Sequence, residues 1–270
     1  MIDVRAHLAR KPLLFDGGMG TYYKAKPGTE CEQGNLLDPA GVRKVHREYL
    51  AAGAEAIKTN TFSLPRMAAA RQPDWQALAR AGWKLAAEAA VETGAAVFAD
   101  LGPAPDTEAA PAGSIYTAVA RCFVEQGAKN FLFETLSSDA GVLEAVQAVK
   151  AQVPDAFVLV SFAVLPDGYT RETLGERAKI LAGIMPVVSQ RNAIFMENEV
   201  NGIHVAEDIM EAFAGLDREQ GEALGLEISL KMAREALPYA DGFYLMTPFN
   251  RVALMERLIA RLKTELLQEQ

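Results

Sequence analysis

The sequence predicts an α/β fold built on a parallel β-sheet. Short, continuous apolar runs alternate with longer helical patterns, half of the residues are apolar, and no linker interrupts the alternation. Continuous apolar runs are typical of strands that are covered on both faces, as in a parallel sheet with helices outside it. A chain of 270 residues also fits one α/β barrel domain, which commonly needs about 250 residues.

Six apolar runs are predicted as strands. They lie at residues 13–15, 56–59, 95–99, 130–133, 157–162 and 242–246. A seventh strand is expected within 179–188 or within 192–196, and an eighth is not evident.

Helical patterns separate these runs. Asp38 and Pro39 predict the N-cap and first residue of one helix, and Gly53 predicts its end. Further helices are predicted over 75–93, 115–126, 139–152 and 251–267.

Two arrangements of such a sheet compete, a closed TIM (β/α)8-type barrel and an open doubly wound sheet. No GxGxxG motif opens a helix after the first predicted strand, so the dinucleotide-binding form of the open sheet lacks its fingerprint. We therefore expect a single barrel domain over residues 1–270. Because one strand is not visible, the barrel is expected to be incomplete or hybrid.

Composition narrows the classes of partner. The net charge of −8, from 27 basic and 35 acidic residues, argues against binding to nucleic acid or to an anionic membrane surface. No apolar run approaches the length of a membrane span, and the first residues lack the pattern of a signal peptide. The two cysteines, Cys31 and Cys122, form no CxxC motif, and we expect a reducing, cytoplasmic location.

Polar residues follow the predicted strands where barrel enzymes place their chemistry, at the carboxyl ends. We expect Asp16, Gly17, Asn60, Asp100 and Glu134 to meet at the mouth of one small-molecule pocket. The glycines after Asp16 offer backbone N–H groups to a ligand carboxylate, although a plain tight turn explains them equally well. The carboxylate of Glu134 is predicted either to bind an amine or to pair with a lysine or arginine at the rim.

Several segments resemble the homocysteine S-methyltransferase family in residue type, order and spacing over the first 165 residues. They are DGGMGT at 16–21, VHREY at 45–49, AGA at 52–54, IKTNTF at 57–62 and FETL at 133–136. The resemblance implies a (β/α)8 barrel that transfers a methyl group to the thiolate of homocysteine, in methionine and one-carbon metabolism. It implies that Asp16, Gly17 and Gly18 lie beside the amino-acid substrate, that Asn60 lines the pocket, and that Glu134 binds the substrate ammonium. A folate or a corrinoid protein is the expected methyl donor.

Residues 178–270 resemble methylenetetrahydrofolate reductases, which are FAD-carrying barrels. The resemblance rests mainly on ILAGIMP at 180–186 and DGFYLMTPFNR at 241–251. It implies that Arg251 contacts folate, whereas the plain alternative is an ion pair with Glu256 or the rim. Some bacterial proteins fuse the two enzymes in this order, but this chain is too short for both. It is expected to join the front of one barrel to the back of the other near 165–179.

The methyltransferase resemblance implies zinc held by three late cysteines, and these are absent. Cys31 lies in an early loop, and Cys122 is predicted at a packing position on a helix. The nearest substitute ligands are Glu197, Glu199 and His204, which form a weak pattern. We expect no tightly bound zinc, and no FAD because the flavin-binding half of the reductases is missing. The alternatives to an active methyltransferase are a non-catalytic or hybrid barrel subunit and a folate-binding relative of the reductases.

Overall fold

The computed structural model describes residues 2–10, 13–162, 181–199, 204–240, 242–246 and 251–266. The chain divides into two compact units, Met1–Phe162 and Ala163–Gln270. The division falls close to the junction expected near 165–179. Organisation as one barrel domain stays a prediction.

The first unit contains a four-stranded parallel sheet in the order β1-β2-β3-β4. Its strands are β1 (Ala56–Lys58), β2 (Ala96–Leu101), β3 (Asn130–Leu136) and β4 (Phe157–Phe162). These four agree with the predicted runs. The order follows the sequence without a reversal, as it does in a barrel.

The predicted strand at 13–15 is wrong as a regular strand. Phe15 forms only an isolated parallel bridge with Ala56, and the Asp16 N–H donates to the Ala56 carbonyl over 2.9 Å. The run is too short to extend this pairing, because Gly17 and Gly18 follow it directly. The residues nevertheless lie beside β1 in the place that a preceding parallel strand would take.

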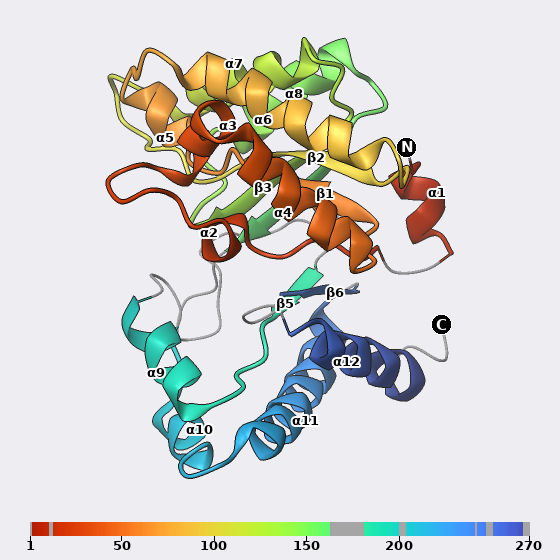
Figure 1. Ribbon diagram of the computed structural model, residues 1–270. Helices are drawn as coiled ribbons and strands as arrows, with labels where there is room; N and C mark the ends of the chain where they lie inside the picture. The colour runs from red at the N-terminus through yellow and green to blue at the C-terminus, as the bar shows by residue number, and fades with distance from the viewer. Residues whose placement is uncertain are drawn as a thin grey trace. The chain divides into compact units, whose positions relative to one another are not determined.

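Eight α-helices and one 3-10 helix, η1, are found among the described residues of this unit. They are α1 (Val4–Leu8), α2 (Met19–Tyr22), η1 (Cys31–Gln33), α3 (Gly34–Leu37), α4 (Pro39–Ala51), α5 (Leu64–Ala69), α6 (Trp75–Ala90), α7 (Ala112–Val124) and α8 (Val142–Gln152). Figure 1 shows α6, α7 and α8 along one face of the sheet. The predicted cap of α4 is confirmed, since Asp38 Oδ1 accepts the Gly41 N–H over 3.0 Å.

The strands of the first unit are covered on both faces. Ile57, Val97 and Phe131 belong to the large core shared with the helices, whereas Phe98 and Leu132 belong to a second cluster on the opposite face. All six residues of β2 are buried, as its continuous apolar run predicts. Strand β4 departs from this pattern, with Val160 39% exposed, because β4 ends the described sheet and has a neighbour on one side only.

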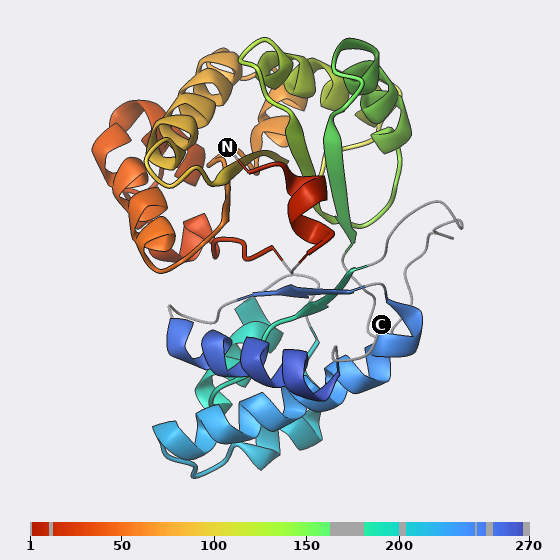
Figure 2. The ribbon, with the colours of Figure 1, turned by 90° about the vertical axis from the view of Figure 1, so that its right-hand side faces the viewer.

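The second unit pairs β5 (Leu181–Ile184) with β6 (Gly242–Leu245) in parallel. The seventh strand therefore lies within 179–188, whereas 192–196 is helical. The helices are α9 (Gln190–Glu199), α10 (Glu207–Ala212), α11 (Arg218–Ala236), η2 (Leu237–Tyr239) and α12 (Val252–Glu265). Figures 1 and 2 show α11 and α12 side by side, with Leu230 and Leu258 buried in their shared core.

Across the described ranges the strands form one four-stranded and one two-stranded sheet, so closure of an eight-stranded barrel stays a prediction. None of the helices in these ranges is long and apolar enough to cross a bilayer.

Candidate functional site

Four charged side chains gather where β1, β2 and β3 end, and we call them the strand-end cluster. They are Asp16, Lys58, Asp100 and Glu134. Lys58, Asp100 and Glu134 occupy the alternate strand positions that share a face with the buried Phe98 and Leu132. The sheet thus carries an apolar face that changes to a charged one at its carboxyl end, where parallel-sheet proteins bind ligands.

Glu134 forms an ion pair with Lys58. Their Oε1 and Nζ atoms are 2.7 Å apart, and the two side chains are only 14% and 11% exposed. The structure thus contains an ion pair of the kind that was predicted as the alternative role of Glu134. Lys58 was missed by sequence reasoning because it lies inside the apolar run that predicts β1.

Asp16 lies at the buried edge of the cluster and is 6% exposed. Its Oδ2 accepts the backbone N–H of Lys58 over 3.1 Å, and its Oδ1 has no hydrogen-bond partner in the part of the chain that the structure describes. Burial raises the pKa of Asp16 from 3.8 to about 7, against the opposing charge of Lys58. Asp16 therefore exchanges a proton near neutral pH.

Asp100 lies on β2, between the strands that carry Lys58 and Glu134, and is 3% exposed. Burial raises its pKa well above the usual range, and the negative charge of Glu134, to which it also hydrogen-bonds, raises it further. Its Oδ1 atom is buried without a partner among the described residues. The cluster thus sets three carboxyl groups against one lysine, and it retains acceptor capacity for protons or for a cationic group.

The backbone behind Glu134 is strained. Thr135 has a φ of 57°, in a region that β-branched residues rarely adopt, and the β3–β4 register shifts between Phe133 and Leu136. The Thr135 N–H donates to Ser161 Oγ over 2.8 Å and holds the irregular segment to β4. Irregularities of this kind are common near active sites, and Glu134 lies within this one.

Asn60, predicted to line the pocket, has its amide nitrogen engaged in structural bonds. It donates to the Cys31 carbonyl over 2.9 Å and to Asn35 Oδ1 over 3.0 Å, while Asn35 donates back to the Asn60 carbonyl. These bonds hold the short helices η1 and α3 against the end of β1. Burial also raises the pKa of Cys31 to about 12, so its thiol is protonated at neutral pH.

The turn after Asp16 is shaped by Tyr49. A Cβ atom at Gly17 would lie 2.6 Å from the Tyr49 hydroxyl oxygen, and Tyr49 donates to the Gly18 carbonyl over 3.4 Å. Gly18 itself has an ordinary φ of −68°. The need for glycine at position 17 therefore comes from close packing of a tyrosine. The predicted ligand contact of the Gly17 and Gly18 N–H groups stays a prediction.

The residues present do not fit the zinc site of the resemblance. The sequence has two cysteines, and Cys122 is buried in the core of the first unit, as predicted. Glu197 binds His204 Nδ1 over 3.0 Å and the Val205 N–H over 2.6 Å, and the side chain of Glu199 lies outside the described set. Across the described ranges, no three His, Cys, Asp or Glu side chains are grouped as metal ligands.

Arg251 forms an ion pair with Glu222 on α11. The plain alternative for Arg251 was an ion pair with Glu256 or the rim, and among the described residues its carboxylate partner is Glu222 and not Glu256. Arg257 binds the other oxygen of the same carboxylate over 3.0 Å. Contact of Arg251 with folate is an untested prediction.

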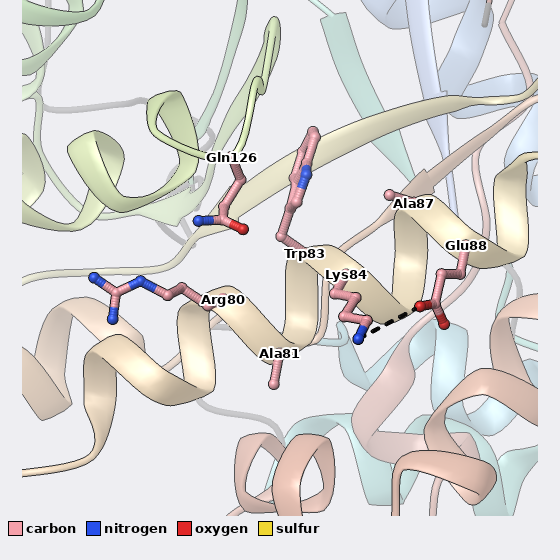
Figure 3. A pocket seen from close by; sticks show the side chains of 7 residues that line it. All are labelled: Arg80, Ala81, Trp83, Lys84, Ala87, Glu88 and Gln126. Carbon is pink, nitrogen blue, oxygen red and sulfur yellow. Dashed lines mark ion pairs between the residues drawn. The ribbon is translucent and has the colours of Figure 1, made fainter.

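A surface hollow lies on the outside of α6, away from the strand ends. Figure 3 shows its lining residues, Arg80, Ala81, Trp83, Lys84, Ala87, Glu88 and Gln126. Lys84 and Glu88 form a loose, exposed pair at 3.9 Å. Nothing in this hollow matches the buried, under-bonded carboxylates of the strand-end cluster, which is the better candidate site.

Comparison with known proteins identifies similar sequences and folds. The family model described as homocysteine S-methyltransferase matches residues 13–231, which include the whole strand-end cluster and extend beyond residue 178. The oxidized form of the homocysteine methyltransferase MmuM from Escherichia coli aligns with a TM-score of 0.59 and 18% identity, over 97% of this chain and 100% of that one. Its metallated form aligns with a TM-score of 0.57 and 16% identity, over 96% of this chain and 99% of that one. These likenesses show an α/β fold with a parallel sheet and helices.

Proposed function

The chain belongs to the homocysteine S-methyltransferase family, and on that premise we propose that it binds homocysteine or a similar amino thiol as a methyl acceptor. The strand-end cluster is the proposed binding site. The observation that carries the proposal is the set of three largely buried carboxyl groups where adjacent strands end, two of which have an oxygen without a partner among the described residues. Such oxygens are costly to bury and are satisfied when a ligand donates to them.

In the proposed complex the substrate lies over the carboxyl ends of β1, β2 and β3. Glu134 binds the ammonium group, since a buried carboxylate attracts a cation more strongly than an exposed one does. The N–H groups of Gly17 and Gly18 bind the carboxylate. Asp16, with a pKa of about 7, is the member of the cluster suited to accept a proton near neutral pH.

The proposed reaction is methyl transfer to the thiol sulfur, in one-carbon and methionine metabolism in the cytoplasm. The acceptor loses its thiol proton, a bond forms between sulfur and the methyl carbon, and the bond from that carbon to the donor breaks. A folate or a corrinoid protein is the proposed donor. We also propose that the fold closes as a (β/α)8 barrel, which the uninterrupted order β1-β2-β3-β4 supports.

A second candidate function is a non-catalytic barrel subunit that retains the amino-acid site. The observation that favours it is the cysteine content, because two cysteines cannot supply the three thiolates of the family's zinc site. A folate-binding relative of the reductases is a third candidate, resting on the resemblance of residues 178–270 and on Arg251.

The test measures methionine formed from homocysteine with a sulfonium, a methylated folate and a methylated corrinoid as donors. Turnover with any donor that falls at least tenfold in Glu134→Gln, and is unchanged in the exposed-site control Lys84→Met, supports the methyltransferase. Homocysteine binding without turnover supports the non-catalytic subunit. Absence of both binding and turnover contradicts the proposal.

A further inference from the structure

The carboxylate assigned to the substrate ammonium already has an ammonium partner within the chain. Lys58 Nζ lies 2.7 Å from Glu134 Oε1, and both side chains are largely buried. The pair is therefore protected from the solvent screening that weakens ion pairs on a surface.

Lys58 reaches this position because of the sheet register. It pairs with Phe98 across the β1–β2 ladder, and Asp100 pairs with Leu132 across the β2–β3 ladder. Lys58 and Asp100 lie on the same face of the sheet as Glu134, so the lysine side chain extends over β2 toward β3. Three neighbouring strands thus hold the cation and its carboxylate.

Charge balance favours the intact ion pair between Lys58 and Glu134. Glu134 and Lys58 neutralise each other at 2.7 Å, and burial of Asp16 and Asp100 opposes the ionisation of both carboxyl groups. A second ammonium would add an uncompensated positive charge to the buried site, unless Lys58 moved away or a carboxyl group lost its proton.

We propose that Lys58 is a specificity-determining residue of the strand-end cluster: its ammonium occupies the place of a substrate ammonium, and thereby disfavours amino acids relative to thiol acids that lack the amino group. The inference rests on the proposed function only in placing the ligand at this site. It departs from that function in the class of acceptor that the intact site favours, which is a short carboxylic acid bearing a thiol and no amino group.

The test is calorimetry of the whole chain with two probes, homocysteine and 4-mercaptobutanoate, which is the same molecule without its amino group. The wild-type chain is expected to bind 4-mercaptobutanoate at least as tightly as homocysteine. Lys58→Met, which keeps an unbranched side chain of similar size but removes the charge, is expected to reverse the order and to favour homocysteine by tenfold or more, because Glu134 then needs a cation.

Two further variants sharpen the comparison. Lys58→Met/Glu134→Gln removes both charges and is expected to show less than a threefold difference between the two probes. Lys84→Met removes an exposed lysine from α6 and is expected to behave as the wild type. The fluorescence of Trp75 and Trp83, the two tryptophans of the chain, reports whether each variant folds.

A wild-type chain that prefers homocysteine by tenfold or more overturns the inference, whether or not Lys58→Met folds, and leaves the proposed function standing. A folded Lys58→Met that gains no preference for homocysteine also overturns it. If neither probe binds the wild type or Lys58→Met at millimolar concentration, the inference and the proposed acceptor site both fail.

Discussion

Replacement of Asp16 by asparagine is expected to make the chain more stable at neutral and alkaline pH. Asparagine keeps the shape of the side chain and an oxygen to accept the Lys58 N–H, and it removes the buried ionisable group. The pKa of Asp16 is about 7 in the folded chain and 3.8 ordinarily, so the folded state binds the proton more tightly. The wild type therefore loses stability as pH rises from about 4 to about 7, and the full loss persists above pH 7.

The size of the effect follows from the two pKa values. The interval between 3.8 and about 7 corresponds to about 4 kcal/mol in total, of which about 2–3 kcal/mol falls between pH 5 and pH 8. Urea unfolding followed by tryptophan fluorescence reports the first unit, because Trp75 and Trp83 both lie on α6. The stability of Asp16→Asn relative to wild type should rise by that amount between pH 5 and pH 8. A difference in unfolding free energy that does not change with pH, or a variant less stable than wild type at pH 8, would refute the conclusion that Asp16 is a buried ionisable group.

Three other predictions address packing, acid stability and metal content. Gly17→Ala should cost about 1–3 kcal/mol of unfolding free energy through its clash with the Tyr49 hydroxyl. Tyr49→Phe in the same chain should recover part of that cost, because two ring carbons remain 3.0 Å from the new Cβ; equal costs in both backgrounds would contradict the contact. His46 is fully buried with both ring nitrogens unpartnered among the described residues, and burial lowers its pKa to about 4, so wild-type stability falls as pH drops from 6.5 toward 4. His46→Leu should lessen that loss by about 2 kcal/mol between pH 7.5 and pH 4.5, measured by urea unfolding, and an unchanged acid profile would show that His46 does not cause it. Elemental and absorbance analysis of the purified protein should find neither stoichiometric zinc nor FAD, and one zinc per chain, lost on replacing His204, would overturn the ligand argument.

The strands and long helices of the first unit could be predicted from sequence because their signals are local. Continuous apolar runs located β2, β3 and β4, and Asp38 with Pro39 located the start of α4. The apolar run at 13–15 predicted a regular strand wrongly. Its apolar content does not reveal that only one isolated bridge to β1 forms there. The helix α11 was missed although Asp217 and Gln220 form a capping box at its start, a signal that can be read directly from the sequence.

The candidate site could be predicted only in part. Asp16, Asp100 and Glu134 are visible because polar residues that follow apolar runs mark the ends of parallel strands. Lys58 is not visible in this way, because its partner lies 76 residues further along the chain and is brought near only by the sheet register. The structural role of Asn60 depends in the same way on tertiary contact, with the short helices η1 and α3.

The most direct test of the central claim is a crystal structure of the chain with homocysteine bound. The account predicts the ligand over the carboxyl ends of β1, β2 and β3, with its nitrogen within hydrogen-bonding distance of Glu134 and with Lys58 Nζ moved from its 2.7 Å contact. Homocysteine bound at another place, or bound with the Lys58–Glu134 contact intact, would contradict it.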